Sequence, residues 1–349
     1  MQKKRWWWIG GLALGAATGY AALRRHRTLE QQCASNRAVS VLVVGAGVVG
    51  STYAAQLARR GMHVTLLARG QRLQTLLRRG LIVEDMLTGC KKQSSVQVIS
   101  ALPPDADYDL VIVAVRYGQT AETLEAIRDL ADTTPILTLQ NNPEGAETFA
   151  RKLGKTHLLM GFPATGGHRI AEWVRSSPLW VMSTVVGESD GADTQALHQT
   201  LAILRRADIR VEVERRMVPW LQTHAAGIAA LAGVAYKNGG KARRMARNTQ
   251  DVKLYLSALR EAYAILQGTG IPITPESQLA IFERPLWLQM LIVRAMLWTP
   301  WAAEIVDEHL AAAPEEMRAL YDQVLSLAKR AGLDVPFFES LGEYFPKGE

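Results

Sequence analysis

The chain has 349 residues, of which 48% are hydrophobic and 21% charged, and its formal net charge is +7. This length and ordinary composition predict a globular protein of two domains and exclude a low-complexity or repeat protein. The two cysteines, Cys33 and Cys90, lie in unrelated settings, so a disulfide framework and a cysteine-based metal centre are excluded. We expect no metal ion.

The positive charge is concentrated at the N-terminus. Residues 1–40 contain seven lysines and arginines and one glutamate, so they carry +6 of the net charge of +7. No predicted helix of the remaining chain has a continuous basic stripe, which nucleic-acid binding proteins usually show. We therefore expect no nucleic-acid partner.

Residues 6–23 form an uncharged stretch of 18 residues between two basic clusters. This length is at the short end of what crosses a bilayer as a helix. A cleaved signal peptide would not be followed by the basic cluster 24–27, and a soluble amphipathic helix would need a polar face. The stretch predicts a single-pass membrane anchor in the lipid bilayer, with residues 28–39 as a tether and a cytoplasmic body.

A glycine motif follows the apolar run 40–44, which predicts a buried parallel strand. In a dinucleotide-binding turn the first glycine permits the tight turn, the second lets the backbone approach a pyrophosphate, and the third lets helix and strand pack closely. A helix up to Gly61 and a second strand at 63–68 complete the strand–helix–strand unit of about 30 residues. The predicted phosphate-binding residues are Gly45, Ala46, Gly47, Val48, Val49 and Gly50.

The residue after the second strand indicates which nicotinamide cofactor binds. NAD-binding proteins carry an acidic residue here, which accepts hydrogen bonds from the ribose. This chain has Arg69, and an arginine fork suits a 2′-phosphate. We therefore predict NADP(H); the alternative is a surface arginine without a ligand.

Polar residues follow the next two apolar strands, at 109–115 and 135–139. Arg116 and Gln119 follow the first of these strands, and Asn141 follows the second. Ligands of open α/β sheets bind beyond the carboxyl ends of the strands. The sequence therefore places these three residues where cofactor and substrate meet, although each of them could also be a turn residue.

These motifs and their spacing resemble the ketopantoate reductase family over residues 40–345. The resemblance implies an NADPH-binding Rossmann domain, a mostly helical C-terminal domain and an active site in the cleft between them. It places Arg116 at the family's cofactor-contacting lysine and Asn141 at its asparagine near the nicotinamide and the substrate. It also places Gly167 where the family offers a backbone contact to the cofactor.

A helix predicted to start at Pro219 departs from the family at three positions. The resemblance places Gln222 at the catalytic lysine, and Ala226 and Ala230 at two substrate-binding asparagines. A glutamine can hydrogen-bond a carbonyl, but it cannot deliver a proton or offer a positive charge to a substrate carboxylate. Ketopantoate is therefore a poor candidate for the substrate, although the reductase scaffold is kept.

Two further residues are candidates for catalysis. His224 lies two positions after Gln222 and could act as a general acid at neutral pH, or be a half-buried helix histidine. Glu316 falls at the family's active-site glutamate, but it also lies in a first helical turn, where any glutamate favours the helix dipole. Both alternatives stay open for each residue.

The predicted fold class is α/β, with a parallel-sheet Rossmann domain followed by a mostly helical domain. The predicted divisions are 1–39 for the anchor and tether, 40–215 for NADP binding, and 216–349 for the substrate and dimer domain. The expected function is NADPH-dependent reduction of a small carbonyl compound, such as a 2-oxo acid. A non-catalytic NADP(H)-binding protein and a related imine or hydroxyacid dehydrogenase are the alternatives. The apolar helix predicted at 285–298 is either a buried central helix or the contact of a homodimer.

Overall fold

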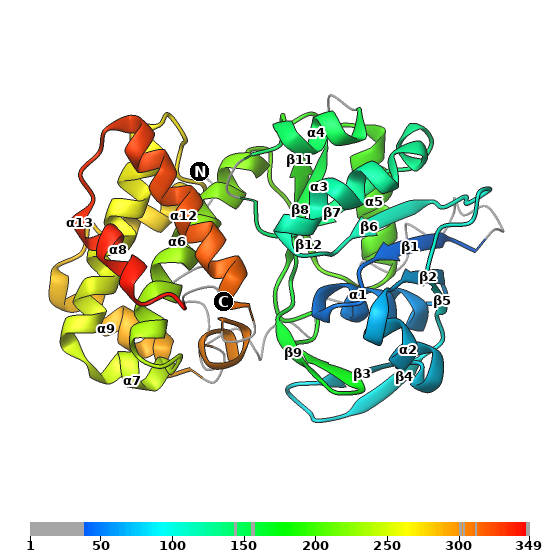
Figure 1. Cartoon of the computed structure of the whole chain (residues 1–349), viewed down its shortest axis with the longest axis horizontal. Helices are drawn as coiled ribbons and strands as arrows, with labels where there is room; N and C mark the ends of the chain where they lie inside the picture. Colours follow the sequence, from blue (N-terminus) through cyan, green and yellow to red (C-terminus); the bar gives the residue numbers. More distant parts are fainter. Residues whose placement is uncertain are drawn as a thin grey trace, which may run out of the picture.

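The computed structural model describes residues 38–142, 145–154, 158–299, 302, 304–310 and 313–346. Figure 1 shows a sheet-rich part on the right and a helical part on the left. The predicted fold class, a Rossmann-type sheet followed by a mainly helical region, is confirmed. The sheet part ends with β12 (Val211–Val213) and the helical part begins with α6 (Met217–Lys237). The predicted boundary between residues 215 and 216 falls in this connection, and the division into domains stays a prediction.

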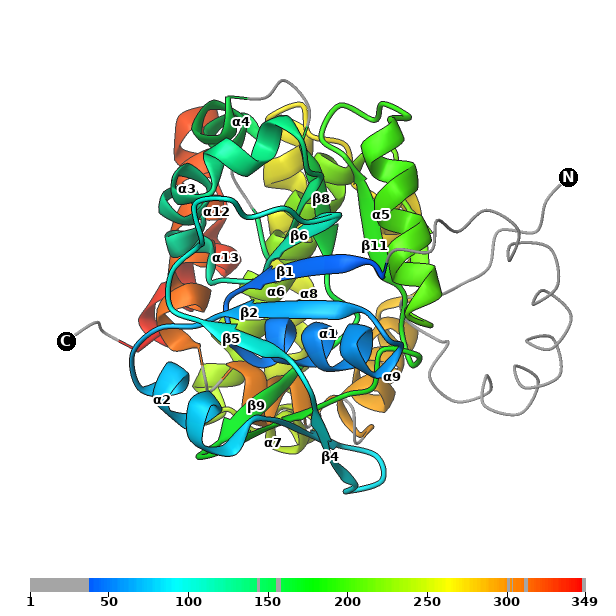
Figure 2. The same ribbon diagram turned by 90° about the vertical axis from the view of Figure 1, so that its right-hand side faces the viewer.

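The main sheet has eight strands in the order β12-β11-β8-β7-β6-β1-β2-β5. Neighbouring strands are parallel except for β8 and β11, which are antiparallel. Figure 2 shows β6, β1, β2 and β5 in succession. The strands are β1 (Ser40–Val44), β2 (His63–Leu67), β5 (Gln97–Ile99), β6 (Leu110–Val113), β7 (Ile136–Leu139), β8 (Leu159–Phe162), β11 (Thr184–Glu188) and β12.

Helices cover both faces of this sheet because alternate residues of its strands point to opposite sides. Val41 and Val43 share one core with α1 and α5, and Leu42 and Val44 share the other with α3, α4 and the start of α6. All four side chains are 0–4% exposed, which explains the uninterrupted apolar run. The helices are α1 (Val48–Arg59), α2 (Gly70–Arg79), α3 (Tyr117–Ala126), α4 (Glu147–Leu153) and α5 (Gln195–Arg206).

A second sheet of four strands, in the order β4-β3-β10-β9, packs beside α1. Its strands are β3 (Leu81–Asp85), β4 (Lys91–Ser94), β9 (Gly167–Ile170) and β10 (Trp173–Ser176). The short apolar runs 80–85 and 95–99 suggest small exposed strands from sequence alone. Instead, Leu81 and Val83 are buried in this sheet, and residues 97–99 add an edge to the main sheet. The partner strand β10 lies some ninety residues later, so local sequence does not reveal it.

The helical part is built around α6, which packs against α8 and α12. Its alanines at 225, 226, 229 and 230 are fully buried, and such small side chains let neighbouring helices approach closely. The other elements are α7 (Ala242–Arg247), α8 (Thr249–Gly268), α9 (Leu286–Leu297), a π-helix (Glu304–His309), α12 (Pro314–Ala331) and α13 (Pro336–Ser340). The helix predicted from Pro219 thus begins two residues earlier, at Met217.

Helix α9 is buried on one face only. Val293 and Leu297 face the core, whereas Trp287 and Leu291 are 66% and 55% exposed. The expectation of a helix buried on all sides is therefore wrong. Its exposed apolar face suits the other expectation, a contact between two copies, and the homodimer stays a prediction. Sedimentation of the full chain at micromolar concentration measures whether two copies associate.

The expected membrane localisation requires a correction. Within the part of the chain that the structure describes, no helix is both long and apolar enough to cross a bilayer. The predicted anchor itself, residues 6–23, lies outside the described residues. A single-pass anchor with a cytoplasmic body was inferred from hydropathy and flanking charge alone, and neither shows that a stable spanning helix forms. The bilayer partner and the membrane assignment are withdrawn.

Candidate cofactor and active site

The glycine loop between β1 and α1 is held by contacts that exclude side chains. Gly45 has a φ of +104°, and a Cβ there would lie 2.5 Å from the carbonyl oxygen of Ala114. A Cβ on Gly50 would lie 1.9 Å from the carbonyl oxygen of Gly45. Ala46 between them is 7% exposed. The first and third glycines thus have the turn and packing roles expected from the sequence.

Gly47 differs, because a Cβ at this position would meet nothing within 4 Å. It caps α1 with extended backbone angles, and its carbonyl accepts the first helical hydrogen bond from Ser51 at 3.0 Å. Val48 and Val49 form the first turn and are half-buried. The open space in front of a helix N-terminus fits the pyrophosphate of a dinucleotide, which the helix dipole and free amides favour.

Three adjacent strands bring the predicted cofactor residues to one edge of the sheet. Strand β1, which ends in the glycine loop, lies between β2 and β6. Arg69 follows β2 and Arg116 follows β6, so the two arginines flank the loop, and both are exposed. Gln119 is also exposed, in the first turn of α3. Among the described residues we find no hydrogen bond or ion pair to the Arg69 guanidinium, so it is available for a phosphate.

Arg72 is a residue of this site that our reading of the sequence missed. It is 9% exposed, and its Nε donates to the Ala46 carbonyl at 3.1 Å. The signal that could have found it is its place on α2: it shares the buried stripe of that helix with Thr75 and Leu76. An arginine on the buried face of a helix requires polar partners there.

Asn141 joins the sheet part to the helical part. It follows β7, the strand next to β6, and its Nδ2 donates to Glu316 Oε1 of α12 at 3.1 Å. Its Oδ1 is buried and has no hydrogen-bond partner within the described structure. Two residues that are 175 positions apart in sequence, and that the resemblance assigns to one active site, are thus in contact.

Gln222 and His224 lie on α6, and Gln222 faces the loop that follows Asn141. Gln222 is 8% exposed, and its Nε2 is 3.9 Å from the position of a Cβ on Gly145, in the loop that follows Asn141. The His224 ring is half-buried and stacks on Trp220, with ring centroids 5.5 Å apart and planes at 2°. It also packs against Phe162, with centroids 4.1 Å apart. The histidine is thereby fixed by aromatic packing.

Gly167, the remaining predicted cofactor contact, is the first residue of β9. It has a φ of +145°, and a Cβ there would lie 2.1 Å from the carbonyl oxygen of Arg175 in the paired strand β10. Sheet packing alone therefore explains a glycine here. A backbone contact from Gly167 to the cofactor stays a prediction.

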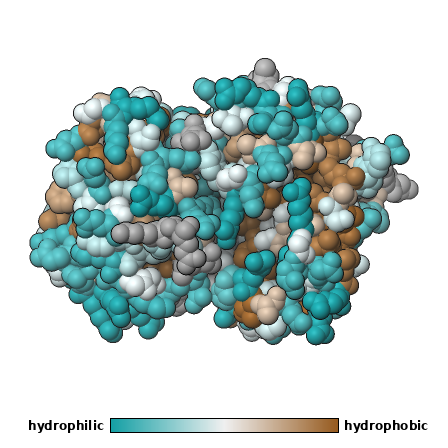
Figure 3. Space-filling model, in the orientation of Figure 1, coloured by the Kyte–Doolittle hydropathy of each residue, from teal (hydrophilic) through white to brown (hydrophobic). Residues whose placement is uncertain are grey.

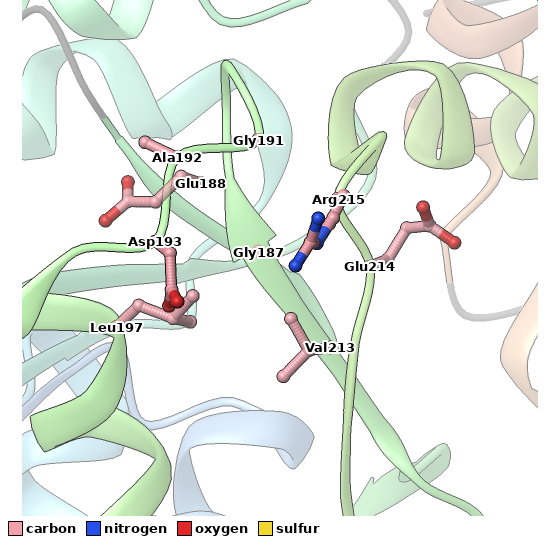
Figure 4. Close-up of a pocket in the computed structure, with 9 residues that line it drawn as sticks. All are labelled: Gly187, Glu188, Gly191, Ala192, Asp193, Leu197, Val213, Glu214 and Arg215. Carbon is pink, nitrogen blue, oxygen red and sulfur yellow. The ribbon is translucent and has the colours of Figure 1, made fainter.

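A small pocket lies elsewhere, beside β11 and β12 (Figure 4). Its volume is about 70 Å³, well below the 300 Å³ or more typical of ligand pockets. Glu188, Asp193 and Arg215 line it, and none of the predicted site residues does. Clusters of three or more histidine, cysteine, aspartate or glutamate side chains able to hold a metal ion do not occur in the described part of the chain.

The fold and the loop define a class: a two-part α/β protein with a Rossmann-type sheet and a helical second part. Its outline is indented where the parts meet (Figure 3). Residues 41–181 match the family model of ketopantoate reductase PanE/ApbA. The expected resemblance to the ketopantoate reductase family, as a divergent relative, is thereby confirmed for this part of the chain.

The individual relatives are distant. A 2-dehydropantoate 2-reductase of Pyrococcus horikoshii is 26% identical over 187 residues, which are 52% of this chain and 58% of that protein. A crystal structure of 2-dehydropantoate 2-reductase from Geobacter metallireducens matches with a TM-score of 0.70 and 20% identity over 88% of this chain and 99% of the other. The structure of a D-mandelate dehydrogenase with NADH and anilino(oxo)acetate matches with a TM-score of 0.70 and 15% identity, over 88% of this chain and 97% of the other. At such identities the two structures show the shared fold.

Proposed function

We propose that this protein is an NADP(H)-dependent oxidoreductase that transfers a hydride to a small carbonyl compound, such as a 2-oxo acid. The observation that carries the proposal is the hydrogen bond between Asn141 and Glu316. It places a carboxyl group of α12 at the carboxyl end of β7, two strands from the glycine loop. Polar groups at this junction would meet both a cofactor on the sheet and a substrate between the two parts.

The predicted residues other than Gly167 divide into catalytic, substrate-orienting and cofactor-binding roles in this scheme. When bound, the nicotinamide cofactor supplies the hydride to the carbonyl carbon. The carbonyl oxygen needs a proton, and Glu316 and His224 are the titratable groups among the proposed catalytic residues. Gln222 and the carboxamide of Asn141 can orient the substrate through hydrogen bonds. Gly45–Gly50, Arg69, Arg116 and Gln119 would hold the cofactor.

The substrate is expected to differ from ketopantoate. Gln222 offers no positive charge, and Ala226 and Ala230 are fully buried with no polar atoms in their side chains. A substrate that needs a cation for its carboxylate and carboxamide side chains for its hydroxyl group would find neither at these positions of α6. We therefore propose a smaller or more apolar carbonyl compound, which is also consistent with a hydroxyacid dehydrogenase.

The test is a binding and turnover assay on the purified full-length chain. NADPH fluorescence measures cofactor binding, and NADPH oxidation is followed with a panel of 2-oxo acids and simpler ketones. Oxidation with at least one carbonyl compound supports the proposal. Tight NADPH binding without turnover on any of them would favour the alternative, a non-catalytic NADP(H)-binding protein.

The cofactor preference is expected to depend on Arg69. An Arg69→Asp variant should weaken NADPH binding by about ten- to a hundred-fold, because a carboxylate repels the 2′-phosphate that the guanidinium would bind. NADH affinity should change little or rise. Arg78→Asp is the matched control, since Arg78 is an exposed arginine of α2, the helix that Arg69 precedes, and contacts the Gln74 carbonyl. An unchanged ratio of the two affinities in the Arg69 variant would refute this role.

A further inference from the structure

Arg72 is a buried arginine that holds the back of the glycine loop. Besides the contact of its Nε with the Ala46 carbonyl, its Nη2 donates to the Ser51 hydroxyl at 3.2 Å. Its Nη1 donates to the Glu172 carbonyl at 3.4 Å. One side chain of α2 therefore joins the start of α1 and the turn between β9 and β10.

The contact with Ala46 fixes the direction of the following amide. The C=O of Ala46 and the N–H of Gly47 belong to one trans peptide unit, so they point in opposite directions. Ser51 Oγ also donates to the Ala46 carbonyl, at 3.2 Å, so this carbonyl is held by two donors. The N–H of Gly47 therefore points away from Arg72. Gly47 is also the residue at which a Cβ would meet no atom within 4 Å.

The Arg72 guanidinium also lacks a counter-ion. None of the carboxylates in the described ranges pairs with it; Glu172 offers its backbone oxygen, while its carboxylate pairs with Arg79 at 2.9 Å. Burial lowers the pKa of Arg72, and the nearby positive charge of Arg169 lowers this pKa further. A buried charge without a partner is costly. An anion bound at the glycine loop would balance it.

We propose that Arg72 is the positioning residue of the pyrophosphate site: it aims the Gly47 N–H at the phosphates and supplies the positive charge behind them. This role rests on the proposed dinucleotide binding. Because NADPH and NADH share the pyrophosphate, Arg72 acts on both equally. Arg69, in contrast, acts on the 2′-phosphate alone.

The experiment compares Arg72→Met and Arg72→Lys with the unaltered full-length chain. Calorimetry or fluorescence gives the affinities for NADPH, NADH and 2′-AMP, the last of which has no pyrophosphate. The methionine variant should bind both dinucleotides about ten-fold or more weakly, by the same factor, and 2′-AMP unchanged. The lysine variant keeps the positive charge but cannot make all three hydrogen bonds of the guanidinium. Its dinucleotide affinities should lie between those of Arg72→Met and those of the unaltered chain. Arg78→Met, on the exposed face of α2, should change none of the three.

The outcomes separate this role from others. Unchanged dinucleotide binding in Arg72→Met would overturn it, and so would a loss confined to NADPH. If 2′-AMP binding and thermal stability fall together with dinucleotide binding, Arg72 has only a structural role. If the methionine variant does not fold, the affinities of Arg72→Lys for NADPH, NADH and 2′-AMP test the role of Arg72 instead. If the unaltered protein binds neither dinucleotide, the proposed function fails first, and this role fails with it.

Discussion

A Gly50→Ala variant is expected to lose stability and, with it, dinucleotide binding. Its Cβ would lie 1.9 Å from the Gly45 carbonyl oxygen, a contact with backbone that cannot rotate away. The Gly45 backbone cannot move away either, because the Ala114 carbonyl packs closely against its Cα. Either β1 or α1 must therefore shift, and overpacking of this kind costs about 3 kcal/mol or more. Urea denaturation measures the loss in the free energy of unfolding.

The matched control for this prediction is Gly47→Ala, three residues earlier in the same loop. An alanine there meets nothing within 4 Å and keeps an allowed φ of −72°, so the stability should fall by about 1 kcal/mol or less. Its methyl group nevertheless occupies the space where the pyrophosphate would approach, and NADPH affinity should fall about ten-fold or more. Equal stability losses in the two variants would contradict the steric argument. Unchanged NADPH affinity in Gly47→Ala would contradict the proposed phosphate site.

A Glu316→Ala variant is expected to lose turnover while NADPH affinity stays the same. The side chain accepts a hydrogen bond from Asn141 at 3.1 Å and lies at the junction of the two parts. Loss of a group that donates or orients a proton lowers kcat by about a hundred-fold or more. Glu316→Gln keeps an acceptor for Asn141 but removes the ionisable group, so it separates orientation from proton transfer. Steady-state kinetics with the active carbonyl compound give kcat and KM for each variant.

Glu315→Ala is the control, because both glutamates lie in the first turn of α12. Either carboxylate favours the helix dipole by about 0.3–1 kcal/mol, so both variants should share a small loss of stability. Glu315 is exposed, and its removal should leave turnover unchanged. Equal kinetic effects of the two substitutions would show that Glu316 acts only through the helix.

The glycine loop between β1 and α1 could be predicted from sequence because its requirements are local. A turn after a buried strand needs glycine where φ is positive or where helix and strand touch, and Gly45 and Gly50 meet these conditions. The positions of Arg69 and Arg116 could be predicted for the same reason, since each lies within about three residues of the end of a strand. The order of parallel strands then brings these residues to one edge.

Other features depend on residues far away in the chain. Arg72 shares the buried stripe of an amphipathic helix, but only the tertiary structure shows that its guanidinium contacts the Ala46 carbonyl. The membrane prediction fails because hydropathy and flanking charge at 6–23 are local properties, which do not establish that a spanning helix forms. For His224, helical spacing brings Trp220 onto the same face of α6, but the contact with Phe162 depends on how α6 meets β8, which spacing along one helix does not reveal.

The sequence by itself determined the Rossmann-type sheet, the glycine loop and the family resemblance, because period, glycine position and strand ends are properties of neighbouring residues. Tertiary structure decided that Asn141 meets Glu316, that Gln222 lies beside the loop after β7, and that a second sheet packs on α1. These contacts join segments separated by tens to hundreds of residues. Their geometry follows from how the hydrophobic cores of the sheet and of the helical part pack, which a local pattern does not encode.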